Sequence, residues 1–198
     1  MRLLVFLTLC SFELFAIFNF PPKRLVFRLL DPTKDAWTVM SQKKKFYLLY
    51  RSNENDTLMG ETSKCVQTKY YEIDRAHKTL KNRILYRNDE TGHMEEYAVL
   101  ITFKKSNDTL PYYDIISVGS LDTTISVTRD YQLLFTDNKT CHTVRSVEDD
   151  QFQVWMTEDY HPKDIDQGCE NAYQDAPLIF SCPAPRQKYY IYNETICN

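Results

Sequence analysis

Two short runs of alternating residues, 141–147 and 152–156, constrain the fold of this chain more than any other feature. In an extended chain, alternate side chains point to opposite faces of a sheet. Because only a short acidic turn separates the runs, we expect them to pair as antiparallel neighbours. The pattern therefore predicts a β-hairpin that turns His142, Gln153 and Trp155 toward one concave side.

The same extended pattern recurs along most of the chain, with short polar gaps between the runs. The 14 Tyr and 11 Phe residues favour strands. About eight short strands at regular spacing indicate a β-sandwich or an up-and-down barrel. The expected strands are 46–50, 64–72, 80–87, 94–103, 112–118, 124–128 with 131–136, 141–147 and 152–156.

Two short helices are expected outside the strands. Asp31 can cap a helix whose first turn contains Pro32, and that helix should end near Gln42. A second helix is expected over 168–175, and 188–192 should form a last extended piece. No internal repeat or linker is present, so residues 20–198 are expected to form one domain.

The N-terminus resembles a secretory signal. Arg2 provides a basic start, and the apolar run 3–12 is too short to span a bilayer. We therefore assign 1–19 as a signal peptide whose cleavage site stays open, and we expect a secreted, extracellular protein without a membrane anchor.

Cysteine usage agrees with an oxidising compartment. Cys10 falls in the expected signal, which leaves five cysteines, enough for two bridges and one spare thiol. No Cys-x-x-Cys pair occurs, so zinc and thioredoxin-type chemistry are not expected. Four Asn-x-Thr sequons are candidate glycosylation sites: Asn55, Asn107, Asn138 and Asn193.

Composition and motifs argue against several other functions. The net charge of −3 gives no basic surface for nucleic acid. The four histidines lack metal-ligand spacing, and no Gly-x-Ser-x-Gly nucleophile motif occurs. We therefore expect no enzyme activity, no metal and no cofactor.

Several short motifs, in their order and spacing, resemble the tick salivary lipocalins, the group that includes the histamine-binding proteins. The resemblance covers about 35–197. Its marks are Asp35-Ala36-Trp37, Tyr47-Leu48-Leu49-Tyr50-Arg51-Ser52 with Asn55-Asp56 and Gly60, Lys64-Cys65-Val66, Phe135-Thr136-Asp137 before Cys141, and Val154-Trp155 before Cys169.

This resemblance implies an all-β fold, an eight-stranded antiparallel up-and-down barrel with a short N-terminal helix, a C-terminal helix on its wall and a ligand cavity. It also implies the disulfides Cys65–Cys197 and Cys141–Cys169. Cys182 is then left without an obvious partner. A monomer is expected, and a dimer joined through Cys182 stays open.

The family's amine-binding signature is altered in this chain. Its Asp is replaced by His142 and its Glu by Gln153, whereas Trp155 matches the aromatic position and Asp56 an acidic one. An ammonium that leaves water needs countercharge, so these changes argue against tight histamine or serotonin binding. A weak cation–π site stays open. The candidate cavity residues are Tyr50, Asp56, Met59, His142, Gln153 and Trp155.

Two classes of function remain. In the first, the secreted protein sequesters a host mediator in its cavity, either a biogenic amine or a lipid such as a leukotriene or fatty acid. In the second, its outer surface blocks a host defence protein, for example a complement component. The plainer interpretation is that Trp155 is a core residue and that His142 and Gln153 are a hydrogen-bonded buried pair.

Overall fold

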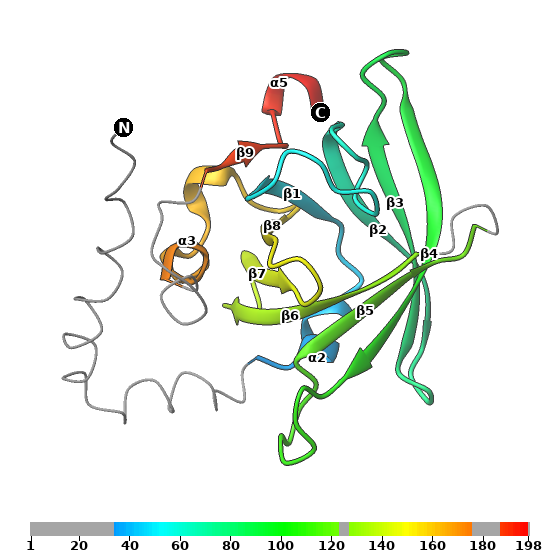
Figure 1. Ribbon diagram of the computed structural model, residues 1–198, viewed down its shortest axis with the longest axis vertical. Helices are drawn as coiled ribbons and strands as arrows, with labels where there is room; N and C mark the ends of the chain where they lie inside the picture. Colours follow the sequence, from blue (N-terminus) through cyan, green and yellow to red (C-terminus); the bar gives the residue numbers. More distant parts are fainter. Residues whose placement is uncertain (1–33, 123–126, 176–186, 198) are drawn as a thin grey trace, which may run out of the picture. The chain divides into compact units, whose positions relative to one another are not determined.

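Eight antiparallel strands close into a barrel because β1 pairs with β8 along one edge and with β2 along the other (Figure 1). All other neighbours in the barrel are consecutive in sequence, so the topology is up-and-down. The strands are β1 (Phe46–Arg51), β2 (Lys64–Asp74), β3 (Thr79–Arg87), β4 (Met94–Lys104), β5 (Ile115–Ser120), β6 (Thr128–Thr136), β7 (Cys141–Ser146) and β8 (Phe152–Thr157).

The computed structural model describes residues 34–122, 127–175 and 187–197. The expected signal peptide, the expected helix cap at 31–33 and Cys182 lie outside these residues. The short elements beside the barrel are α2 (Ala36–Met40), the 3-10 helix η3 (Pro162–Asp164), α3 (Gln167–Asp175), β9 (Tyr189–Tyr190) and α5 (Glu194–Cys197). The extended piece expected over 188–192 contains the short strand β9, and residues 194–197, which follow it, form α5.

Helix α2 begins later than expected, and the same contacts shorten β5. Asp35 caps the helix, because its Oδ2 accepts the amide N–H of Thr38. The amide N–H of Ala36 also donates to the carbonyl of Tyr113, and Tyr113 N–H donates to Asp35 Oδ1. These bonds to α2 use backbone groups of Tyr113, and the strand expected from residue 112 begins only at Ile115.

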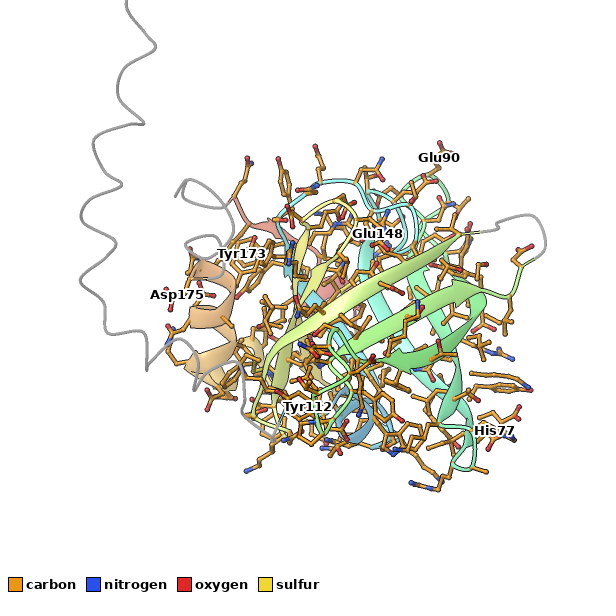
Figure 2. The ribbon with its side chains drawn as sticks, turned by 60° about the horizontal axis from the view of Figure 1, so that its bottom comes forward. His77, Glu90, Tyr112, Glu148, Tyr173 and Asp175 are labelled. Atoms are coloured by element: carbon orange, nitrogen blue, oxygen red, sulfur yellow. A yellow bond between two sulfur atoms is a disulfide. The ribbon has the colours of Figure 1, made fainter. Side chains whose placement is uncertain are left out.

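Apolar side chains form two layers, one inside the barrel and one between the barrel wall and α3. The outer layer contains Tyr47, Phe152 and Tyr173, and Figure 2 shows Tyr173 on α3. A β-bulge in β1 shifts the register with β8 between Leu48 and Tyr50. As a result, Leu48 packs inside the barrel and Tyr50 in the outer layer.

Both disulfides implied by the family resemblance are present. Cys141–Cys169 joins β7 to α3, and Cys65–Cys197 joins β2 to α5. A disulfide that closes a chain segment as long as either of these typically stabilises a fold by about 3–5 kcal/mol. The two bridges thus hold the C-terminal elements against the barrel.

Replacement of Gly168 by alanine should loosen the packing of α3. A Cβ at this position would overlap the ring of Phe135 on β6. We expect Gly168→Ala to lower the free energy of unfolding by about 1–3 kcal/mol, as overpacking typically does. Urea denaturation with intact disulfides measures the change.

The matched control is Asn171→Ala, an exposed position on the same helix. Its effect should stay within about 0.5 kcal/mol. The smaller ring in Phe135→Leu should reduce the cost of Gly168→Ala. Equal stability of Gly168→Ala and the wild type would contradict the packing described for α3.

Candidate functional site

A small cavity of about 40 Å³ lies inside the barrel. A water molecule occupies roughly 10–15 Å³ of such volume, so the cavity has room for about three waters. Its walls are mostly apolar, with a few polar groups. The lining residues are Met40, Phe46, Met59, Thr68, Ile84, Ile101, Ile116, Val118, Tyr131, His142, Val144, Gln153 and Trp155.

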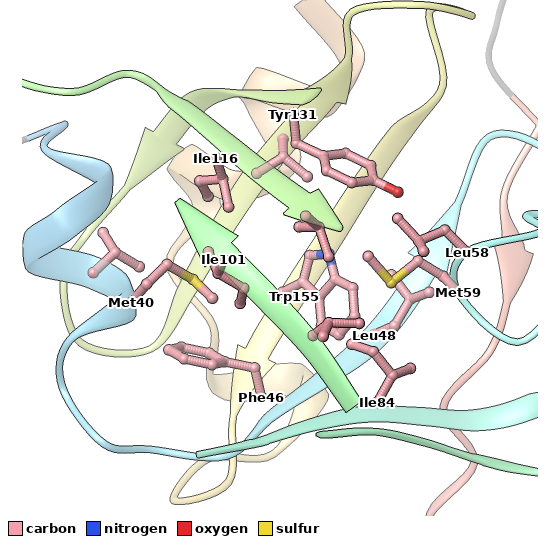
Figure 3. Packing of buried hydrophobic residues seen from close by; sticks show 14 of the residues in the cluster. Met40, Phe46, Leu48, Leu58, Met59, Ile84, Ile101, Ile116, Tyr131 and Trp155 are labelled. Atoms are coloured by element: carbon pink, nitrogen blue, oxygen red, sulfur yellow. The ribbon is translucent and has the colours of Figure 1, made fainter. Parts of the chain in front are cut away.

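Two methionines lie on opposite sides of Trp155 in this interior (Figure 3). Met40 comes from α2, and Met59 comes from the loop between β1 and β2. Methionine side chains have many rotamers and adapt to irregular spaces. They are therefore the lining residues best suited to move if the cavity enlarges.

The hairpin of β7 and β8 places three of the expected site residues together. His142 lies opposite Trp155 in the register, and Gln153 lies opposite Val144. All three candidate side chains are buried and line the cavity. The ring of His142 is parallel to the indole of Trp155, with 6.3 Å between ring centroids.

Gln153 connects Trp155 to Asp56. Its Oε1 accepts the indole N–H of Trp155 at 3.0 Å, and its Nε2 donates to Asp56 Oδ2 at 2.7 Å. Both ends of the amide are therefore used. The prediction that Gln153 and His142 bond to each other is wrong, because the amide reaches the first loop instead.

Asp56 is fully buried, and its countercharge comes from within the chain. Its Oδ1 lies 3.0 Å from Nη1 of Arg129 and also accepts the amide N–H groups of Leu58 and Met59. Burial raises the pKa of Asp56, while Arg129 and these amides act in the opposite direction. The carboxylate that an amine would need is thus already paired.

Arg129 and Arg51 are site residues that the sequence analysis missed. Arg129 lies on β6, two residues before the inward-facing Tyr131, so the alternation of that strand could have identified it. Arg51, unlike the partly exposed Arg129, is completely buried, and it donates to the carbonyls of Glu54, Met59 and Glu61. It holds in place the loop that carries Asp56 and Met59.

His142 is neutral at physiological pH. Burial lowers its pKa to about 3, and Asp137 opposes this shift only weakly. The ring of Phe46 meets it edge-on at 4.9 Å. Its Nδ1 is buried and has no hydrogen-bond partner among the described residues. The side chain therefore offers an uncharged hydrogen-bonding group in an apolar wall.

Tyr50 does not line this cavity, although it was one of the expected cavity residues. The bulge in β1 turns its ring outward, where it packs against Tyr173 of α3. Its hydroxyl donates to the carboxylate of Glu170. Burial and this carboxylate raise the pKa of the Tyr50 hydroxyl.

Other sequence features have defined positions in the structure. Three sequon asparagines, Asn55, Asn107 and Asn193, are exposed, whereas Asn138 is half-buried; their glycosylation stays a prediction. The described residues contain no group of three side chains suited to a metal ion. No helix in the described ranges is long and apolar enough to cross a membrane.

Acid should destabilise the protein through His142. The unfolded histidine takes up a proton near pH 6.5, whereas the folded one does so only near pH 3. Stability is therefore lost as pH falls from about 6.5 toward 3, by up to about 5 kcal/mol. Urea denaturation between pH 7 and 4 measures the loss, and His142→Leu should reduce this pH dependence.

The control is His93→Leu, at an exposed position, which should keep the wild-type pH profile. The test compares how steeply the free energy of unfolding changes with pH, because loss of the imidazole packing also changes stability at pH 7. Parallel pH profiles for His142→Leu and the wild type would rule out a buried neutral histidine.

Comparison with solved structures shows that the fold is a lipocalin-like barrel. The serotonin complex of a protein called AM182 has a TM-score of 0.56 and 14% identity, over 85% of this chain and 95% of that one. The cockroach allergen Per a 4 has a TM-score of 0.46 and 13% identity, over 74% and 85% of the two chains. Identity this low shows the fold alone.

The family itself is defined by sequence. The family model described as tick histamine binding protein matches residues 28–198, most of the chain. This chain therefore belongs to the tick histamine-binding protein family, whose members are binding proteins and not enzymes. No curated protein matches the sequence.

Proposed function

We propose that this protein is a secreted small-molecule scavenger whose barrel binds an uncharged or weakly polar ligand, such as the body of a lipid mediator, and not a biogenic amine. Its removal of that mediator would dampen host inflammatory or haemostatic defence. Family membership supports small-molecule binding and secretion. The internal pairing of Asp56 with Arg129 supports the choice of ligand class.

The negative charge of Asp56 is already paired inside the protein. An ammonium ligand entering the barrel loses its hydration and needs a carboxylate in exchange. Arg129 and Gln153 already satisfy the carboxylate of Asp56, and His142 and Gln153 stand where the family signature has acids. A cationic ligand would therefore have to displace the internal guanidinium.

The remaining walls of the cavity suit a ligand with an apolar body. Most of the cavity surface is aliphatic or aromatic, and its buried polar atoms without a hydrogen-bond partner among the described residues include His142 Nδ1 and Thr68 Oγ1. A ligand with an apolar body and one hydroxyl or carbonyl group would satisfy them. Buried polar atoms without partners are costly, so such a bond would favour binding.

The interior cavity must enlarge before it can hold such a ligand. A cavity of about 40 Å³ is well below the roughly 300–1,000 Å³ of typical ligand pockets. The side chains of Met40 and Met59 would have to adopt other rotamers, and the loop that Arg51 holds in place would have to move. Ligand binding is therefore expected to change the environment of Trp155, which lies between the two methionines.

Titration with a ligand panel tests this function. We expect the uncharged methyl ester of arachidonic acid or of a leukotriene to change the fluorescence of Trp155, while histamine and serotonin leave it unchanged at the same concentrations. The variant Trp155→Phe identifies the signal, because Trp37 remains as the other indole. Binding of amines alone, or of no compound in the panel, would contradict the proposal.

Removal of the internal cation should make the barrel responsive to amines. Arg129→Met leaves Asp56 without its cation, which we expect to cost about 3–5 kcal/mol of stability. Histamine should then raise the melting temperature of Arg129→Met more than that of the wild type. The control is Arg83→Met, which breaks an exposed ion pair with Glu96. Equal histamine responses in wild type and Arg129→Met would mean that Asp56 is not the limiting charge.

The small interior also favours a second function, the blocking of a host defence protein by the outer surface. A barrel with room for about three waters can fold and act without a ligand. The two functions separate experimentally. A protein that binds none of the lipids or amines but captures a single complement component from host plasma fits the second function.

A further inference from the structure

A larger pocket, of about 280 Å³, lies outside the barrel between α3, η3, β1 and β9. Figure 1 shows α3 and β9 on the same side of the barrel. The pocket is about seven times the volume of the interior cavity and close to the lower end for small-molecule sites. Its walls include Leu49, Ile165, Tyr190 and Tyr192.

A carboxylate and a tyrosine ring surround one ammonium group in this pocket. Nζ of Lys188 lies 2.6 Å from Oε1 and 2.7 Å from Oε2 of Glu170. The same Nζ lies 4.5 Å from the ring centroid of Tyr50 and 5.9 Å from that of Tyr173. A carboxylate combined with aromatic faces is the arrangement by which proteins bind cationic amines.

Glu170 and the tyrosine rings around it are held in place by contacts that do not involve Lys188. The hydroxyl of Tyr50 and the amide of Gln174 both donate to Glu170. Tyr50 also packs edge-on against Tyr173 and Tyr190, with centroids 5.0 and 5.6 Å apart. The carboxylate and rings would therefore keep their positions if the lysine side chain left.

We propose that this outer pocket binds a small aromatic primary amine, whose ammonium takes the place of Lys188 between Glu170 and Tyr50. The exchange replaces one ammonium by another, so the buried charge does not change. The freed Lys188 side chain, already 22% exposed, extends into water. The aromatic ring of the ligand then occupies the space beside Tyr190 and Tyr192.

Lys188 acts as a tethered competitor for this site. A group held on the chain has an effective concentration in the millimolar range or above. A free amine must exceed that competition, which weakens its apparent affinity for the wild-type protein. This outer site is independent of the barrel function proposed above, because its contacts involve no residue of the interior cavity.

Calorimetric titration with tyramine tests the proposal. We expect Lys188→Ala to bind tyramine with one-to-one stoichiometry and at least about tenfold more tightly than the wild type. The ligand 4-ethylphenol has the same ring without the ammonium and should not bind. The matched control is Lys139→Ala, which removes a lysine near a different ring, Tyr160, and should behave as the wild type.

Two double variants locate the amine. Lys188→Ala with Glu170→Gln should lose tyramine binding, since the countercharge is gone. If that variant does not fold, Lys188→Ala with Tyr190→Ala decides, because Tyr190 is 62% exposed and its loss should weaken binding several-fold without unfolding the protein. Any one of three results would overturn the proposal. These are a folded Lys188→Ala variant that does not bind tyramine, equal binding of 4-ethylphenol and tyramine, and unchanged tyramine affinity in a folded double variant.

Discussion

The buried contact between Asp56 and Arg129 decides what the barrel interior can accept. It joins the loop after β1 to β6, and Gln153 extends it to β8 and to the indole of Trp155. A buried pair of this kind is costly to break, because each partner loses its compensation when the other is removed. The barrel interior therefore contains an acid whose countercharge is supplied by the chain itself.

The outer pocket repeats this arrangement in a form that is easier to open. Glu170 is paired with Lys188, as Asp56 is paired with Arg129. The difference lies in burial and attachment. The side chains of Asp56 and Arg129 are 0% and 15% exposed, whereas those of Glu170 and Lys188 are 26% and 22% exposed. Arg129 belongs to a long strand, and Lys188 precedes a strand of two residues. A charge near water is released at lower cost than one in the core.

Alternation predicted the strands, and the family resemblance supplied the barrel topology. The hairpin register that brings His142 opposite Trp155 follows from two runs with period two, and the cysteine pairing came from the family resemblance. The errors have local physical causes. A bulge in β1 reversed the face of Tyr50, and hydrogen bonds between Tyr113 and the start of α2 shortened β5.

The sequence by itself determined the series of short strands and the absence of two acids from the amine signature, because these depend on periodicity and on residue identity. The choice of a barrel and the pairing of the cysteines came from the family resemblance. Only the tertiary structure decided which charges meet. Arg129 lies 73 residues from Asp56, and Glu170 lies 18 residues from Lys188. Strand closure and the packing of α3 bring these pairs together, and no local pattern encodes such distances. The pairing of each acid is therefore a property of the folded chain.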